Sequence, residues 1–253
     1  MIPWFEYQSI SLGLLKLNVW GIFVSLGFIA GMIVAYFELK KKKLDAGRVY
    51  DLAFWIILSA LIGGRLIYIT EHLNFYWNAP FDVLKLWHGG MSIYGGFIGA
   101  VFACIIYLKK NKLDFWQYAD AVIFGLPFGL FIGRLGCFCI HDHLGAKTNF
   151  FLGVNFPDGA RHDLGLYDSL LGIFIFLLFL FLHRRERFSG FYVSIFAICY
   201  GAVRFLFDFL RATDILGADP RYFSFTLAQY LSAILFITGV YLFFKLRVKK
   251  SRA

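Results

Sequence analysis

Long apolar runs, separated by short connections that are mostly basic, dominate this sequence. Seven runs of about 15–21 residues are each long enough to cross a hydrocarbon core of about 30 Å as an α-helix. We therefore predict an all-α, polytopic membrane protein with seven transmembrane helices, forming a single integral membrane domain over residues 1–253. The predicted spans are Val19–Phe37, Val49–Ile69, Gly89–Leu108, Tyr118–Gly136, Asp168–Leu182, Gly190–Leu210 and Leu227–Phe244.

The composition supports this prediction. Hydrophobic residues make up 60% of the chain and charged residues only 16%, whereas soluble domains are about 45–50% apolar and about 25% charged. These values exclude an ordinary soluble protein. The first residues include Glu6 and no basic cluster, and the first apolar run is too long for the apolar region of a signal peptide, so we expect no cleavable signal.

The basic residues are distributed unevenly between the two sides of the predicted bundle. The first, third and fifth connections and the C-terminal tail hold 16 of the 25 Lys and Arg residues, and the opposite side holds six. The positive-inside rule then places the N-terminus outside and the C-terminus in the cytoplasm. This topology explains the net charge of +9, with anionic membrane lipid as the partner; we expect no nucleic-acid binding.

The three remaining basic residues, Arg65, Arg134 and Arg204, lie inside predicted spans, in the outer half of each. An intramembrane guanidinium is costly unless it is paired or hydrated, so such a residue indicates function. We hypothesise that the three converge on one polar cavity open to the outer leaflet. The alternative is that their side chains extend from the helix ends to the membrane surface.

The sixth span carries charges at helical spacing. Tyr200, Arg204, Asp208 and Arg211 recur at i, i+4, i+8 and i+11, which places them on one helix face. Two arginines against one aspartate leave positive charge to bind an anion, and the commonest anion at a lipid surface is a phosphodiester. Arg suits phosphate because its planar fork donates hydrogen bonds in pairs. A structural ion pair within the bundle is the alternative.

Glycines recur beside the candidate residues of the third and fourth spans. Gly125, Gly129 and Gly133 form two overlapping GxxxG steps, which predict close helix–helix packing next to Arg134. In the third span, Gly89, Gly90, Gly95 and Gly96 bracket a polar turn that contains Ser92 and Tyr94. Such a turn is tolerated at membrane depth where it lines protein or water; a loose helix start is the alternative.

The long outer connection, at about residues 137–167, contains several histidines and acids together with phenylalanines, so we expect it to fold onto the membrane surface. His141 and His143, with Cys137 and Cys139 nearby, match no strong metal-ligand spacing, and we expect no metal. A serine hydrolase using Ser92 is disfavoured because no nucleophile-elbow pattern surrounds this residue.

Four segments together resemble the successive motifs of the phosphatidylglycerol:prolipoprotein diacylglyceryl transferase family: WHGGMSIYGGFIG, GRLGCFCIHDHLG, RHDLGLYD and YGAVRFLFDFLR. The resemblance runs from about Trp20 to the last span. It implies an enzyme of the bacterial inner membrane, with its active site towards the outer face and without a cofactor. Such an enzyme transfers the diacylglyceryl group of phosphatidylglycerol to the lipobox cysteine thiol of a prolipoprotein and releases glycerol phosphate.

The resemblance also implies roles for individual residues. Arg134 matches the signature arginine of the family and Arg204 its second essential arginine. The substrate-binding set it implies is Arg134, Arg204, Asp208, Asp142, Gly145, Arg211, Trp20 and Gly95. The chain departs from the family pattern at five of the matched positions: Asp208 and Asp142 replace Glu, Tyr94 replaces His, Cys137 replaces Asn and Trp20 replaces Tyr.

In this chemistry, Arg134 and Arg204 hold the phosphate and stabilise the charge that develops on its leaving oxygen. The acceptor thiol must also lose its proton, and the candidate bases are His162 and His141, ahead of Tyr94. Other functions remain open: transfer of a lipid group to a different acceptor, an anion channel or transporter, or a non-catalytic lipid-binding protein. A transport path favours charges through the whole bilayer depth, whereas these charges gather in the outer half.

Overall fold

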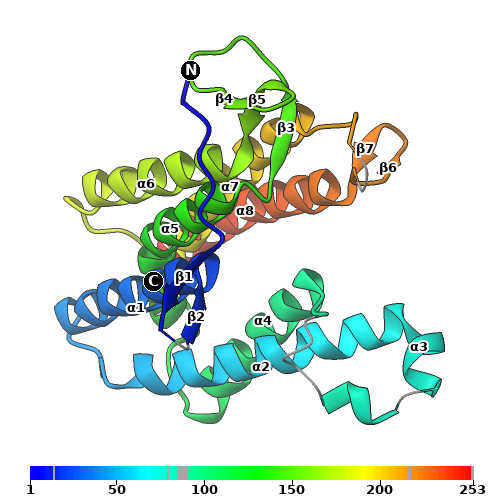
Figure 1. The fold of residues 1–253 in the computed structure, drawn as a ribbon. Coiled ribbons are helices and arrows are strands. Elements are labelled where there is room, and N and C mark those ends of the chain that lie inside the picture. The colour runs from blue at the N-terminus through cyan, green and yellow to red at the C-terminus, as the bar shows by residue number, and fades with distance from the viewer. Residues whose placement is uncertain (14, 79, 85–89, 216–217, 252–253) are drawn as a thin grey trace. The chain divides into compact units, whose positions relative to one another are not determined.

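The computed structural model describes residues 1–13, 15–78, 80–84, 90–215 and 218–251. Most of the described chain is helical (Figure 1). The helices are α1 (Val19–Lys41), α2 (Arg48–Glu71), α3 (Leu73–Asn78), α4 (Ile93–Lys110), α5 (Phe115–Ile140), α6 (Leu164–Leu182), α7 (Phe191–Phe207) and α8 (Leu227–Ser251), with short 3-10 segments η1 (Pro80–Leu84) and η3 (Asp208–Leu210). The strands are β1 (Ser9–Leu12), β2 (Leu15–Asn18), β3 (Leu144–Lys147), β4 (Val154–Phe156), β5 (Gly159–Asp163), β6 (Arg221–Tyr222) and β7 (Phe225–Thr226).

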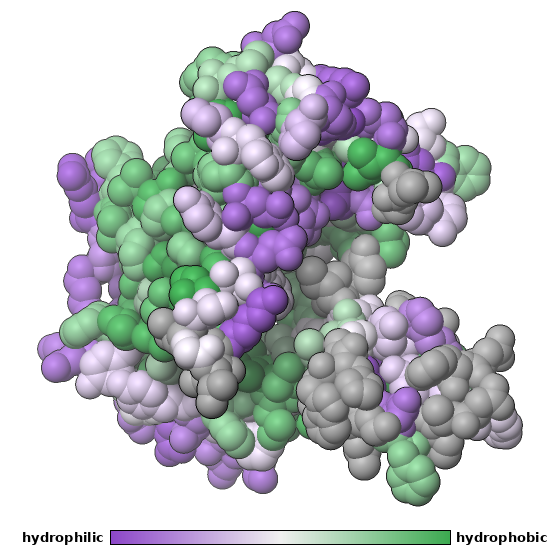
Figure 2. Space-filling model, viewed as in Figure 1, coloured by the Kyte–Doolittle hydropathy of each residue, from purple (hydrophilic) through white to green (hydrophobic). Residues whose placement is uncertain are grey.

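Six described helical segments are long and apolar enough to cross a membrane, and they correspond to six of the predicted spans. The predicted span 89–108 corresponds to α4, which begins at Ile93 and has 18 residues. A mostly helical, polytopic membrane protein is therefore confirmed. Many large apolar side chains of these helices are exposed (Figure 2), as expected for surfaces that face lipid.

The chain divides into two compact units, one formed by Met1–Glu38 with Ala119–Ala253 and the other by Leu39–Tyr118. In the second unit, α2 packs closely against α4 through glycines. A Cβ atom added at Gly95 would lie 2.2 Å from the Gly63 carbonyl oxygen, so only glycine fits there. The sequence predicts a polar turn, and no close helix contact, at these glycines of the third span, so the contact is evident only from the structure.

Arg65 of α2 is bound within this second unit. Its guanidinium donates to the carbonyl oxygens of Val83 (3.0 Å), Asp82 (2.5 Å) and Gly90 (2.9 Å). The side chain is buried, so it does not extend to a helix end in the way that the alternative interpretation required. These three bonds fix the chain between α3 and α4 to α2, which indicates a structural role for Arg65.

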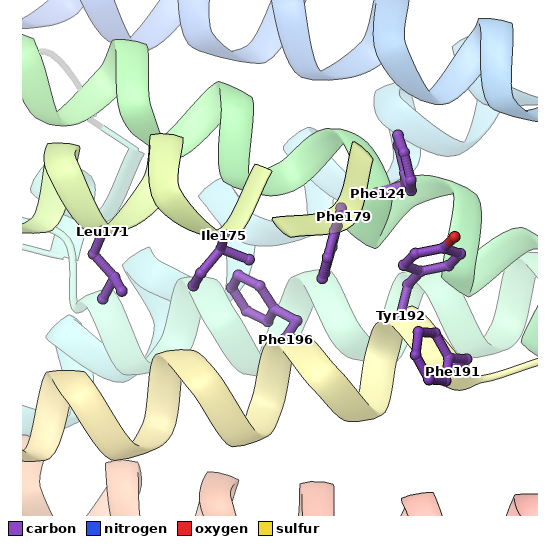
Figure 3. Close-up of a cluster of buried hydrophobic side chains, with 7 residues drawn as sticks. All are labelled: Phe124, Leu171, Ile175, Phe179, Phe191, Tyr192 and Phe196. Atoms are coloured by element: carbon purple, nitrogen blue, oxygen red, sulfur yellow. The ribbon is translucent and has the colours of Figure 1, made fainter. Parts of the chain in front are cut away.

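The first unit has an aromatic core between α5, α6 and α7 (Figure 3). The ring of Phe124 stacks on Phe179 at 5.7 Å and meets Tyr192 edge-on at 5.0 Å. One turn before Phe124, Asp120 of α5 accepts hydrogen bonds from the Gly190 and Val193 amides (2.7 and 3.0 Å). Asp120 therefore satisfies amides that the first turn of α7 leaves without intrahelical partners, and it fixes α7 to α5.

The GxxxG steps of α5 pack against α1, as predicted. A Cβ atom at Gly125 would lie 2.2 Å from the Gly31 carbonyl oxygen, and one at Gly129 would lie 2.7 Å from that of Gly27. The two backbones meet without intervening side chains. This contact leaves the other faces of α5, including the side on which Arg134 lies, to α6 and α7.

The connection between α5 and α6 holds a three-stranded antiparallel sheet in the order β3-β5-β4. The N-terminus lies beside it (Figure 1), where Ile2 forms a bridge with Val154. Asp163, at the end of β5, accepts the Leu166 amide at 2.9 Å and caps α6. The sheet is thus tied directly to the helix ends that surround the candidate site.

Candidate functional site

Arg134 of α5 and Arg204 of α7 meet at one buried carboxylate, that of Asp168 on α6. The Nε atom of Arg134 lies 3.6 Å from Asp168 Oδ2, and the Nε atom of Arg204 lies 3.9 Å from the same oxygen. Asp168 is 2% exposed. Three helices therefore bring two guanidinium groups to a common point inside the bundle, as predicted for Arg134 and Arg204.

Asp208, the first residue of η3, is the second acidic group of the site. Its Oδ1 lies 3.1 Å from Nη1 of Arg204 and 3.9 Å from Nη1 of Arg211, which confirms the pairing predicted for this helix face. Its Oδ2 accepts a short hydrogen bond from the Thr226 hydroxyl group. Asp208 is fully buried, so it anchors Arg204 and Arg211 to the segment that leads into α8.

The charge of the site differs from the sequence interpretation. We predicted surplus positive charge from two arginines and one aspartate, but Asp168 joins Arg134 and Arg204, and Asp219 pairs with Arg211. The sequence could not show these pairs because both added acids lie on other segments. Formal charges of this network therefore balance before any ligand binds.

Several polar atoms of this network nevertheless have unused hydrogen-bonding capacity. Among the described residues, Nη1 of Arg204, Oδ1 of Asp208 and both oxygens of Asp168 are buried without a directed hydrogen-bond partner. Arg204 Nη1 and Asp208 Oδ1 are 3.1 Å apart and form an ion pair, but their geometry does not meet that of a hydrogen bond. Buried polar groups in this condition favour a ligand or water that completes their bonds. The ion pairs orient the guanidinium groups, and the remaining donors are suited to a phosphate.

A second group of side chains lies directly beside Arg134. The Nη1 atom of Arg134 is 3.9 Å from Cys137 Sγ, and the Trp20 side chain interacts with the same thiol. Cys137, Asp142 and His143 place one potential ligand atom each within 4.8 Å of one another. The structure therefore brings Trp20 and Asp142, both predicted site residues, to the neighbourhood of Arg134.

Gly145 contributes backbone rather than a functional group. It forms a β-bridge with Arg211, and a Cβ atom at this position would lie 2.6 Å from His162 Cβ and 2.8 Å from the Leu210 carbonyl oxygen. Only glycine permits this approach between β3, β5 and the segment after η3. Gly145 thus helps to place Arg211, whose side chain reaches Asp208.

His141 is held away from the two arginines by its own partners. Its Nδ1 lies 2.6 Å from Asp163 Oδ2, and its ring packs among those of Trp4, Phe5, Phe138 and Phe156. Both members of the His141–Asp163 pair are buried. The contacts of His141 within the described chain connect the N-terminal segment to the end of α5, and none of them reaches Arg134 or Arg204.

His162 lies on β5 and bonds through Nδ1 to the Tyr167 hydroxyl group at 2.7 Å. Burial lowers the pKa of His162 below its usual value, so the ring is neutral at neutral pH and able to accept a proton. Both residues line an otherwise apolar cavity of about 630 Å³ between the sheet, α6 and α7, together with Phe150, Leu171, Phe174, Val203 and Phe207. None of the described contacts of His162 involves Arg134 or Arg204.

Two predicted residues belong to the second unit. Gly95 lies in the first turn of α4, in close contact with Gly63. Tyr94 precedes it in the same turn, and its side chain lies outside the described part of the chain.

Sequence reasoning missed Asp168 and Thr226 as site residues. Asp168 is the last residue of the RHDLGLYD segment and an acid at the start of an apolar span, which is the signal that could have identified it. Thr226 carries no comparable signal, because a threonine before a helix is a common N-terminal residue. Its bond to Asp208 is evident only from the structure.

Comparisons with known proteins identify the family of this chain. A family model described as prolipoprotein diacylglyceryl transferase matches residues 8–245. The chain belongs to this family. Its resemblance to the family, stated from four motifs, is therefore confirmed over nearly the whole sequence.

Curated relatives from distant bacteria carry one name, phosphatidylglycerol--prolipoprotein diacylglyceryl transferase. The protein of Ehrlichia canis is 33% identical over 232 residues, covering 86% of this chain and 88% of the relative. That of Nitratidesulfovibrio vulgaris is 32% identical over 247 residues, covering 95% and 94%. That of Listeria welshimeri is 31% identical over 253 residues, covering 95% and 90%. The chain therefore spans nearly the full length of these transferases.

Proposed function

We propose that this protein transfers the diacylglyceryl group of phosphatidylglycerol to the cysteine thiol of a prolipoprotein lipobox. The observation that carries the proposal is the meeting of Arg134 and Arg204 at Asp168, inside a membrane protein of the prolipoprotein diacylglyceryl transferase family. Guanidinium groups from separate helices, held by a buried carboxylate, suit the phosphate of a lipid headgroup.

The reaction replaces a C–O bond with a C–S bond. The thiolate of the acceptor attacks the glycerol carbon that carries the phosphate, and the leaving glycerol phosphate takes the electron pair of the broken bond. Arg134 and Arg204 bind the phosphate and stabilise its growing charge. Because Asp168 and Asp208 orient both guanidinium groups beforehand, little reorganisation is needed as this charge develops.

The proposed topology has seven transmembrane helices, with the N-terminus outside and the C-terminus in the cytoplasm of a bacterial inner membrane. The 16-to-6 distribution of basic residues in the sequence supports this orientation. Arg134 and Arg204 then lie towards the outer face, where a prolipoprotein emerges. Cysteine labelling of single-cysteine variants at Ser11 and Ser251 tests the orientation, because an impermeant reagent labels only the outer position in intact cells.

His162 is the first candidate for receiving the thiol proton because it lines the cavity beside α6 and α7 and its lowered pKa keeps the ring unprotonated. His141 is a weaker candidate because Asp163 and four aromatic rings enclose it. A free tyrosine hydroxyl group has a pKa of about 10 and is a poor base at neutral pH, so Tyr94 ranks after both histidines. A His162→Gln variant tests the first assignment: a lower rate that recovers at high pH supports it, and an unchanged rate and pH profile contradicts it.

The experiment that tests the function uses the purified full-length protein, labelled phosphatidylglycerol and a lipobox peptide. The proposal predicts a diacylglyceryl peptide whose C–S thioether bond survives treatment with hydroxylamine, and equimolar release of glycerol phosphate. A peptide in which serine replaces the cysteine is the matched control and gives no product. Lipid turnover without a thioether product indicates a different acceptor, and lipid binding without turnover indicates a non-catalytic protein; either contradicts the proposal.

A further inference from the structure

We propose that Cys137, Asp142 and His143 bind a divalent metal ion of the zinc class, leaving one coordination position for the acceptor thiol. The metal site stands on the geometry of these three residues alone. The role of the open position rests on the proposed function. No residue of this cluster is needed to explain the arginine network described above.

The three side chains converge because the chain turns at the end of α5. Cys137 lies in the last turn of this helix, which ends at Ile140. His141 follows with a positive φ of 52°, and this turn directs Asp142 and His143 back over the helix end. One ligand atom from each residue then lies within 4.8 Å of the other two. The spacing of five and one positions matches no common metal motif, and for this reason the sequence predicts no metal here.

The donor types are those of zinc rather than of magnesium or calcium. A thiolate, an imidazole nitrogen and a carboxylate oxygen form the mixed set that borderline-soft ions prefer. Zinc bonds of about 2.0–2.3 Å place tetrahedral ligand atoms roughly 3.3–3.8 Å apart. Asp142 Oδ1 and His143 Nδ1 are already 3.6 Å apart. His143 Nδ1 also contacts the Asp142 carbonyl oxygen at 3.0 Å, so the imidazole turns from this contact as the three atoms, now within 4.8 Å of one another, close onto one ion.

Access to the site is from one side. The Cys137 side chain is buried, whereas those of Asp142 and His143 are 33% and 28% exposed. An ion held against the buried sulfur therefore keeps a position open beside Asp142 and His143. Three protein ligands and one open position are the usual arrangement of catalytic zinc, whereas structural zinc sites are closed by four protein ligands.

The neighbouring arginine is compatible with a bound cation. Cys137 as a thiolate and Asp142 as a carboxylate together neutralise a divalent ion, with His143 contributing no charge. Arg134 approaches Cys137 Sγ at 3.9 Å, but Asp168 already pairs with its guanidinium group. The ion therefore adds no uncompensated charge to the site.

This position brings the two reactants together. The acceptor thiol loses its proton, for which His162 is the candidate acceptor, as it binds the metal as a thiolate. Its sulfur then lies beside Arg134, which holds the lipid phosphate. The new C–S bond forms as the C–O bond to the phosphate breaks, the phosphate keeps the electron pair, and the metal is unchanged. The metal thus holds the acceptor sulfur as a thiolate beside the lipid phosphate.

Metal binding is measured first, on the purified full-length protein in detergent. After dialysis against zinc we expect equimolar zinc, and with cobalt(II) we expect a thiolate-to-cobalt charge-transfer band. Cys137→Ser abolishes this band, while Asp142→Asn and His143→Gln weaken cobalt binding at least tenfold. Cys139→Ser is the matched control because Cys139 is adjacent but outside the cluster, and it retains the band. Thermal unfolding of each variant identifies any loss of fold; the two variants at partly exposed residues keep the test valid if Cys137→Ser unfolds.

Absence of bound zinc, or a cobalt spectrum unchanged by all three substitutions, overturns the metal site. The open position is then tested with the cobalt-loaded protein and a lipobox peptide. A second thiolate contribution to the charge-transfer band, absent with the serine peptide, supports it; an unchanged band overturns it. Transfer that persists at the full rate in metal-free protein refutes the role of the metal but leaves the proposed function intact. Metal binding without transfer refutes the function but not the site.

Discussion

Arg134 and Arg204 direct their Nε atoms at the same oxygen, Oδ2 of Asp168, at 3.6 and 3.9 Å. The two residues are 70 positions apart and lie on different helices. A shared buried carboxylate fixes the separation of the two guanidinium groups and leaves their outer nitrogens for a ligand. We therefore expect Arg134, Arg204 and Asp168 to contribute jointly to phosphate binding.

Replacing Asp168 tests this relationship. Asp168→Asn keeps the shape of the side chain but removes the negative charge that lies between the two guanidinium groups. We expect transfer to fall at least tenfold and the protein to unfold more easily, because removing one member of a buried ion pair costs about 3–5 kcal/mol. Rate and thermal unfolding are measured together. Glu186→Gln, at an exposed acid in the connection after α6, is the control and changes neither.

The geometry of the guanidinium fork, and not charge alone, determines phosphate binding in this site. Arg204→Lys retains the positive charge but loses the contact of Nε with Asp168 and the contact of Nη1 with Asp208. We expect kcat to fall about 10²–10³-fold, the usual cost of losing one oriented donor to a developing negative charge. Arg221→Lys, on the exposed strand β6, is the matched control. Near-normal transfer by Arg204→Lys would contradict a requirement for the guanidinium geometry.

Thr226 supports Asp208 from the start of α8. Thr226→Val removes the hydroxyl group that donates to Asp208 Oδ2 and preserves the size of the side chain. A buried acceptor without its donor costs about 1–3 kcal/mol, so we expect a lower free energy of unfolding and weaker transfer. Thr226→Ser keeps the hydroxyl group and restores both. If the valine and serine variants behave alike, the hydrogen bond has no role.

Helix α1 has one glycine inside its close contact with α5 and one outside it, which serves as the control. A Cβ atom at Gly27 would lie 2.5 Å from the Gly129 carbonyl oxygen, whereas one at Gly21 meets nothing within 4 Å. We therefore expect Gly27→Ala to separate the helices, lower thermal stability and reduce transfer. Gly21→Ala, in the same helix, leaves both unchanged. Equal effects of the two substitutions in thermal unfolding would contradict the packing described here.

The sheet next to the site carries an acid-sensitive ion pair. Arg161 donates to Asp214 at 2.9 and 2.8 Å, and these bonds lower the pKa of Asp214 to about 2. A carboxyl pKa that is lowered by folding stabilises the folded state above its unfolded value of about 3.9. That contribution is lost as the pH falls towards 2.

Amide hydrogen exchange of β3–β5, corrected for the intrinsic rate, measures this effect. We expect protection to decrease between pH 5 and pH 2 in the wild-type protein. In Asp214→Asn the decrease is smaller, because the charge that acid removes is already absent. A pH dependence identical in both proteins would show that the Arg161–Asp214 pair does not hold this part of the fold.

The membrane class and the helix positions could be predicted from the sequence because each depends on local hydrophobicity. Arg134 and Arg204 could be selected because charge within an apolar span is costly. The glycine contacts of α5 followed from their spacing. In each case, the property that matters lies within one segment of the chain.

The features that sequence reasoning missed depend on contacts between segments. Asp168 balances two arginines that are 34 and 36 positions away, and Thr226 bonds Asp208 across the loop before α8. The surplus charge predicted from α7 alone was wrong for this reason. His141 also had the right chemistry for a base, but Asp163 and the N-terminal aromatic rings enclose it.

The most direct test of the paired arginines is a double-mutant cycle on transfer from phosphatidylglycerol to a lipobox peptide. Arg134→Gln, Arg204→Gln and the double variant are compared with the wild-type protein, with membrane accumulation and folding verified for each. If the two arginines hold one phosphate, each single variant loses about 10²–10³-fold in kcat/KM. The double variant then loses little more activity than the less active of the two single variants. Losses that multiply, or normal transfer in either single variant, would contradict a shared phosphate site.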